Sequence, residues 1–148
     1  MTSPPHPHSH SGKQASALRE STRVAADTAN VGKARRFVRR VLSECGADAV
    51  VADLELVASE LVTNAVEHGN GDDIDITVTC DGGRQVTVTV TSHGGTDNVG
   101  PSDEWRVAEP GSITGRGLGI VRDLADHIDV RKRTGELRIV VERSLPSR

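Results

Sequence analysis

The sequence has almost no aromatic residues, with one Phe, one Trp and no Tyr among 148 residues. A core must therefore be built from aliphatic side chains, and aromatic platforms that stack single-stranded nucleic acid are excluded. Hydrophobic residues make up 35% of the chain, which is enough for one modest core. Long apolar runs are also missing, since a membrane helix needs ~18 such residues and no apolar signal segment follows Met1.

Cysteine and excess charge of one sign are scarce as well. Cys45 and Cys80 form neither a CxxC metal pair nor a dense disulfide framework, and we expect both to fill the core. A reducing cytoplasm is the simplest compartment for such a chain. The net charge of -3 argues against a general nucleic-acid binder, so neither nucleic acid nor a membrane is an expected partner.

The small net charge hides a segregation along the chain. Residues 13–40 contain eight basic and two acidic side chains, whereas residues 41–83 contain ten acidic and no basic ones. The basic block has a helical pattern. It could be a solvated face or a docking face, and its arginines could pair bidentately with carboxylates or phosphate.

Composition and periodicity predict one domain behind a tail. Residues 1–17 are rich in Pro, Ser and His and are expected to be disordered, which leaves 18–148 as a single domain. Apolar spacings of three and four predict helices over 28–42 and 50–68, capped by Asp27 or Thr28 and by Asp48. A third helix is expected over 117–126.

Alternation with period two predicts the strands. One hairpin joins 74–80 to 86–90 through the turn Asp81-Gly82-Gly83, and a second joins 128–131 to 137–142. Residues 18–25 are a candidate edge strand, and 93–116 read as one long loop. The order predicts an α/β two-layer sandwich with helices on one face of a mixed, mostly antiparallel sheet.

The second helix contains the segment SELVTNAVEHG at 59–69. Its polar residues Glu60, Asn64 and His68 are four apart and therefore lie along one strip of the helix. A carboxylate there is a candidate general base, and an amide oxygen suits Mg²⁺. The alternative is a solvated polar flank that ends in a helix cap.

The third helix begins with a glycine-rich segment, TGRGLGI at 114–120. Alternate glycines let backbone N–H groups approach an anion, the helix start is electropositive, and Arg116 adds a charge for phosphate. The pattern is neither a Walker motif nor a dinucleotide fingerprint, and a plain loop-to-helix junction is an equal alternative. Together with the Glu/Asn helix, however, it could hold a nucleoside triphosphate through Mg²⁺.

From about residue 20 to 145 the sequence resembles the ATP-binding anti-sigma factors with serine-protein kinase activity, which belong to the GHKL superfamily and have the Bergerat fold. The segment at 59–69 is similar to that family's N box, and GRGLGI at 115–120 to its second glycine box. The resemblance implies that Glu60 is the general base toward a substrate serine and Asn64 the Mg²⁺ ligand. It implies an ATP site lined by Asn64, His68, Ser92, Gly94, Gly115, Arg116, Gly117, Leu118 and Gly119. It also implies a homodimer whose partners are a sigma factor and an antagonist protein that carries the target serine.

The sequence departs from the family at the adenine end. Ser92, in Val-Thr-Ser-His-Gly-Gly, stands where the family has the Asp that accepts from the adenine amino group. A hydrogen bond to a charged group is worth ~1.5–3 kcal/mol against about 1 for a neutral one, so the loss weakens binding by about tenfold. Gly135-Glu136-Leu137 likewise replaces a Gly-Thr-Thr, and His93 and Asp97 are candidate substitutes for the missing Asp. Two functions follow: an anti-sigma factor that phosphorylates its antagonist, or an inactive pseudo-kinase that only binds partners.

Overall fold

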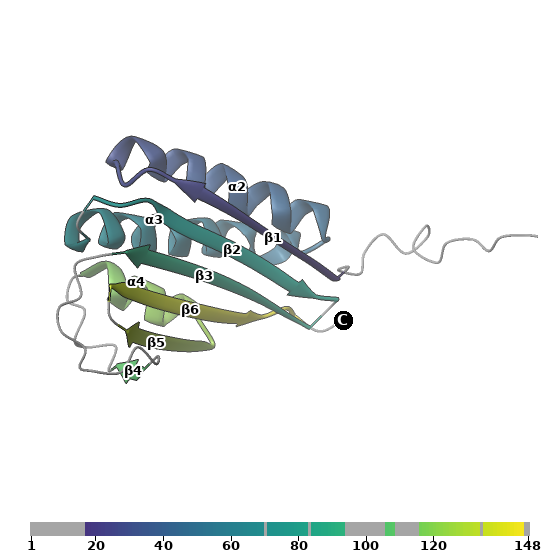
Figure 1. Ribbon diagram of the computed structural model, residues 1–148. Helices are drawn as coiled ribbons and strands as arrows, with labels where there is room; N and C mark the ends of the chain where they lie inside the picture. The colour runs from purple at the N-terminus through teal and green to yellow at the C-terminus, as the bar shows by residue number, and fades with distance from the viewer. Residues whose placement is uncertain are drawn as a thin grey trace, which may run out of the picture.

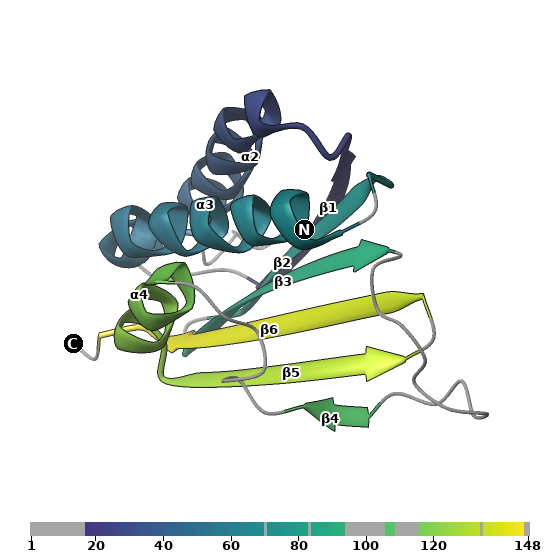
Figure 2. The same cartoon turned by 90° about the vertical axis from the view of Figure 1, so that its left-hand side faces the viewer.

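The computed structural model describes residues 17–69, 71–82, 84–93, 106–108, 116–133 and 135–146. They form a six-stranded sheet in the order β1-β2-β3-β6-β5-β4, with the helices on one face (Figures 1 and 2). The strands are β1 (Ala17–Val24), β2 (Ile74–Asp81), β3 (Gln85–His93), β4 (Arg106–Ala108), β5 (His127–Arg133) and β6 (Glu136–Ser144). The helices are α2 (Val31–Glu44), α3 (Val51–His68) and α4 (Arg116–Leu124), with short 3-10 turns η1 (Thr28–Asn30) and η2 (Asp48–Val50).

Every neighbouring pair among these strands is antiparallel, so the predicted two-layer sandwich is confirmed and its sheet is not mixed in the described part. Burial alternates along β2 and β3, where Ile and Val point toward the helices and Thr residues point to the open face of the sheet. This is the period-two pattern of a sheet covered on one side.

The core between the layers is aliphatic, as the lack of aromatic residues requires. Each helix contributes one apolar stripe, and the two-layer packing leaves the largest of these side chains with almost no exposed surface. Fully buried residues include Val38, Leu42, Leu54, Leu61 and Ile76.

The helix ends show which of the predicted caps and terminating glycines occur in the structure. The carboxylate of Asp27 accepts from the Ala29 backbone N–H at 2.9 Å and caps η1, which leads into α2. Gly46 has φ 81° and allows the Ala47 N–H to reach back to the Leu42 carbonyl at 2.8 Å, which ends α2. The cap predicted at Asp48 is wrong, because that residue belongs to η2 and no side chain caps α3.

Two other expectations are corrected. The long loop is interrupted by β4, which pairs with β5. Cys45 and Cys80 are buried, as expected, but they form a disulfide that joins the end of α2 to β2. Packing of α2 against β2 brings together two residues 35 positions apart, which the sequence spacing alone does not indicate.

The tail predicted for residues 1–17 lies outside the described residues except for Ala17, which opens β1. No helix in the described part of the chain is long and apolar enough to cross a bilayer.

Candidate functional site

The candidate site is built on α3, which lies between α2 and α4 (Figure 2). At 3.6 residues per turn, the residues on either side of its apolar stripe form two flanks. Glu55 lies on one flank, whereas Asp53, Glu60 and Asn64 lie on the other, which we call the acid–amide flank. The contacts of Glu55 and Asp53 show which neighbour each flank faces.

The Glu55 flank faces α2. Arg39 donates to the two carboxylate oxygens of Glu55 at 2.6 and 2.9 Å, and Arg35 lies 3.7 Å away. The hydrogen bonds from Arg39 hold the pKa of Glu55 below its usual value despite the effect of burial. This is the bidentate carboxylate pairing that the basic block allowed, and it fixes the rotation of α3 against α2.

The acid–amide flank faces α4 and β6. Asp53 lies 2.8 Å from the guanidinium of Arg143 on β6, and the same guanidinium donates to the Leu124 carbonyl at 2.8 Å. Leu124 ends α4 and Asp53 is in the first turn of α3, so Arg143 joins the end of one helix to the start of the other where the two helices pack together.

The contacts of Arg143 give a common reference point for the two sequence motifs. At 1.5 Å per residue, Glu60 and Asn64 lie ~10 and ~16 Å along α3 from Asp53, and Arg116 lies ~12 Å along α4 from Leu124. These distances along the two helices are similar, so we expect the first turn of α4 to lie near the stretch of α3 that carries Glu60 and Asn64.

Two polar side chains of the acid–amide flank, unlike Asp53, have no partner in the part of the chain that the structure describes. Glu60 and Asn64 are partly buried, yet neither makes a hydrogen bond or ion pair with a described residue. In α4, Leu118 packs into the core, whereas a Cβ built on Gly119 would meet no atom within 4 Å. The backbone at Gly119 thus faces open space.

Ser92 marks the other end of the site. It is only 6% exposed, on the helix side of β3, and its register partner on β6 is the apolar Leu137. Its hydroxyl makes no hydrogen bond within the described residues, which is costly for a buried polar group. A Cβ built on Gly69, which follows α3, would lie 3.8 Å from the His93 carbonyl oxygen, so α3 ends next to the end of β3.

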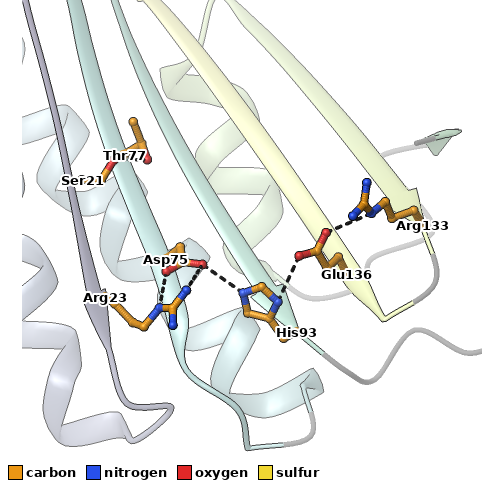
Figure 3. Close-up of polar contacts among 7 residues, drawn as sticks. All are labelled: Ser21, Arg23, Asp75, Thr77, His93, Arg133 and Glu136. Atoms are coloured by element: carbon orange, nitrogen blue, oxygen red, sulfur yellow. Dashed lines mark hydrogen bonds and ion pairs between the residues drawn. The ribbon is translucent and has the colours of Figure 1, made fainter. Parts of the chain in front are cut away.

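His93 cannot replace the missing Asp, so that hypothesis is wrong. Its ring lies on the open face of the sheet, with Nε2 at 3.0 Å from Asp75 and Nδ1 at 3.2 Å from Glu136 (Figure 3). Arg23 and Arg133 extend this network at its two ends, at 2.7 and 3.1 Å from the carboxylates. Burial alone would raise the pKa of Asp75, but hydrogen bonds from Arg23 and His93 outweigh it and lower the pKa.

The sequence analysis did not predict this network. Positions 75, 93 and 136 all fall on the outward-facing side of the alternating pattern, which could have indicated that these side chains share the open face of the sheet. Other parts of the predicted site lie outside the described residues, namely Gly94, Asp97, Gly115 and the side chains of His68 and Arg116. The backbones of Arg116 and Gly117 form the start of α4.

Comparisons with known proteins identify the family and the fold. The family model of the histidine kinase-like ATPase domain matches residues 24–141, and the chain belongs to that family. The predicted membership of the superfamily is thereby confirmed. A solved structure of the RsbU and RsbW domains of Rv1364c from Mycobacterium tuberculosis is similar, with a TM-score of 0.65 and 23% identity. The match covers 88% of this chain and 34% of that chain, so this chain spans about a third of its length. None of the curated proteins matches by sequence.

Proposed function

We propose that the chain is an anti-sigma factor that binds ATP with Mg²⁺ and phosphorylates a serine of its antagonist protein. The observation that best supports this proposal is the packing of α3 on α4 with Arg143 joining the start of one to the end of the other, from which we infer that Glu60 and Asn64 lie near the first turn of α4. Membership of the ATPase family supports nucleotide binding, and the fold of the RsbW-containing chain supports the anti-sigma branch.

The residues present fit ATP and Mg²⁺. The unpartnered Ser92 hydroxyl suits the polar edge of a base, and the open backbone at Gly119 suits a phosphate at a helix start. The amide oxygen of Asn64 is a hard ligand of the kind that Mg²⁺ prefers. Bound MgATP supplies the phosphoryl group and neutralises its developing charge.

Glu60 has the chemistry expected of the base. Its carboxylate has no described partner, so it is free to accept the proton of a serine hydroxyl presented at the start of α4. Leu118 and the core beneath it limit the access of water from the sheet side. The protein's contribution is therefore to position the hydroxyl and hold its proton.

The test is calorimetric titration with ATP in the presence and absence of Mg²⁺, followed by phosphotransfer to the cognate antagonist. We expect Asn64→Ala to lose most of the Mg²⁺-dependent affinity. We expect Glu60→Gln to bind ATP normally but to transfer phosphate ~10²–10⁴-fold more slowly. Glu67→Gln is the matched control, because Glu67 is an exposed acid on the same helix. Unchanged phosphotransfer in Glu60→Gln would refute its role.

A second candidate function is a pseudo-kinase that binds its partners without phosphotransfer. The specific observation in its favour is the base end, where a neutral Ser92 stands opposite the apolar Leu137. No heat on titration with millimolar MgATP would favour this function, and partner binding would then be independent of nucleotide.

A further inference from the structure

The outer edge of the sheet at β1 offers unused backbone groups. β1 is the terminal strand and pairs only with β2 among the described strands, over all eight of its residues. In an antiparallel pair, alternate residues direct their N–H and C=O groups away from the partner strand. An extended segment could therefore add to this edge.

A groove of about 480 Å³ lies at the end of this edge, between residues 22–25 and α2, the helix beside β1 (Figure 1). One flank of α2 forms its helix side, with Lys33, Arg36, Phe37 and Arg40 spaced i, i+3, i+4 and i+7. Arg23 and the end of β1 form its other side. The groove thus combines a strand edge, one aromatic ring and four cationic side chains, and no acidic residue lines it.

Two of the four cations are not neutralised in the described structure. Arg23 pairs with Asp75, and Arg40 pairs with Glu20 at 2.9 Å and with Glu44 at 3.0 Å. Lys33 and Arg36 are exposed and make no ion pair with any described residue. The groove is therefore complementary to negative charge.

Two occupants from the chain itself fit poorly. The sequence of residues 1–16 contains no Asp or Glu, so it offers these cations no carboxylate. A second copy would present its own β1, which carries Arg19, Arg23 and a single acid, Glu20, that already pairs with Arg40. Pairing around Ser21 would also set Arg19 opposite Arg23, and pairing around Glu20 would oppose two glutamates. Like charges directly opposite each other destabilise a strand pair.

We propose that this groove binds an extended acidic segment of a partner protein, which adds to β1 as a seventh strand. Its backbone pairs with the open edge of β1, and the carboxylates opposite Thr22 and Val24 on the helix side lie against Lys33 and Arg36, clear of Glu20. The groove lies on the side of α2 away from α4, so the proposal goes beyond the nucleotide site and does not depend on it.

The test uses a labelled eight-residue peptide of Val and Thr that carries Glu at two alternate positions, those that face Thr22 and Val24, with fluorescence anisotropy measured on the full chain without nucleotide. We expect Lys33→Glu combined with Arg36→Glu to weaken binding by on the order of tenfold, because two exposed charge pairs become repulsive. The same peptide with Gln in place of Glu should bind the unaltered protein more weakly by a similar factor. The matched control reverses Arg84 and Arg122, two exposed cations on other surfaces, and should bind like the unaltered protein.

Hydrogen exchange distinguishes strand addition from adsorption by charge alone. Peptide binding should slow exchange of the outward-pointing amides of β1. The proposal would be overturned if the control with reversed Arg84 and Arg122 lost as much peptide affinity as Lys33→Glu with Arg36→Glu. It would also be overturned if the β1 amides stayed unprotected with the peptide bound. Displacement of the peptide by a short DNA duplex at similar concentration would point instead to nucleic acid. Sedimentation showing a dimer that Lys33→Glu with Arg36→Glu disrupts would point to a second copy, which also overturns it.

Discussion

The substitution Ser92→Asp tests the base end of the site most directly. If the Ser92 position contacts adenine, the change replaces a neutral hydrogen bond worth about 1 kcal/mol with a charge-assisted one worth ~1.5–3 kcal/mol. The midpoint difference corresponds to roughly tenfold tighter ATP binding. Thr89→Asp is the matched control, because Thr89 lies on the same strand but on the open face of the sheet.

The structure also predicts that Ser92→Asp lowers the stability of the nucleotide-free protein. Ser92 is 6% exposed and faces Leu137, so an Asp there is buried in the free protein without a described donor. A buried charged group without a partner destabilises the fold by at least ~2 kcal/mol. Bound ATP relieves this cost. At a fixed saturating ATP concentration, tenfold tighter binding adds about 1.4 kcal/mol of ligand stabilisation.

Thermal unfolding at a series of MgATP concentrations measures both effects, and calorimetry measures the affinity. We expect Ser92→Asp to melt lower than the unaltered protein without nucleotide and to gain more from ATP. Equal or weaker ATP affinity in this variant would show that residue 92 is not at the base end, and the reasoning would fail. A similar gain in Thr89→Asp would show a general charge effect instead.

Three further predictions concern the scaffold. Replacing Cys45 and Cys80 by Ala removes a cross-link that spans 35 residues, and the loop-entropy relation predicts that the free energy of unfolding falls by about 4 kcal/mol. Urea unfolding with and without a thiol reductant measures this difference. The pKa of Glu55 is lowered in the folded state, so its carboxylate stabilises the fold at pH values above its unfolded pKa. This stabilisation is lost as the pH falls through the folded pKa. Glu55→Gln should therefore make the free energy of unfolding less dependent on pH in the acid range. Arg143→Gln breaks the link from Asp53 to α4 and should cost about 1–2 kcal/mol and weaken ATP binding, whereas an unchanged affinity would show that the core alone positions the helices.

Much of the fold could be predicted from the sequence because the long helices and most of the strands have a clear hydrophobic period. The apolar stripe of α3 and the alternation of β2 and β3 need only local spacing, and both agree with the structure. The strip formed by Glu60 and Asn64 follows from the same period. The position of this strip relative to α4 does not follow from the period, because it depends on how Arg143 joins the two helices.

What could not be predicted depends on packing between distant segments. Arg39 was one of several arginines that could bind a carboxylate, and only the placement of α2 against α3 selects Glu55. β4 has three residues and little pattern of its own, so its pairing with β5 defines it. The disulfide likewise follows from the packing of α2 on β2.

The same strand period that builds β3 also limits how the proposed base end, at Ser92, can be repaired. Consecutive residues of a strand point to opposite faces, so Ser92 faces the helices while His93 faces the open side and is held there by Asp75 and Glu136. A polar group one residue away therefore cannot take over the role of residue 92 without a shift in register, which would also turn the buried valines of β3 outward. Restoring a carboxylate at the base end consequently requires a change at a helix-facing position, of which Ser92 and its register partner Leu137 are the nearest pair.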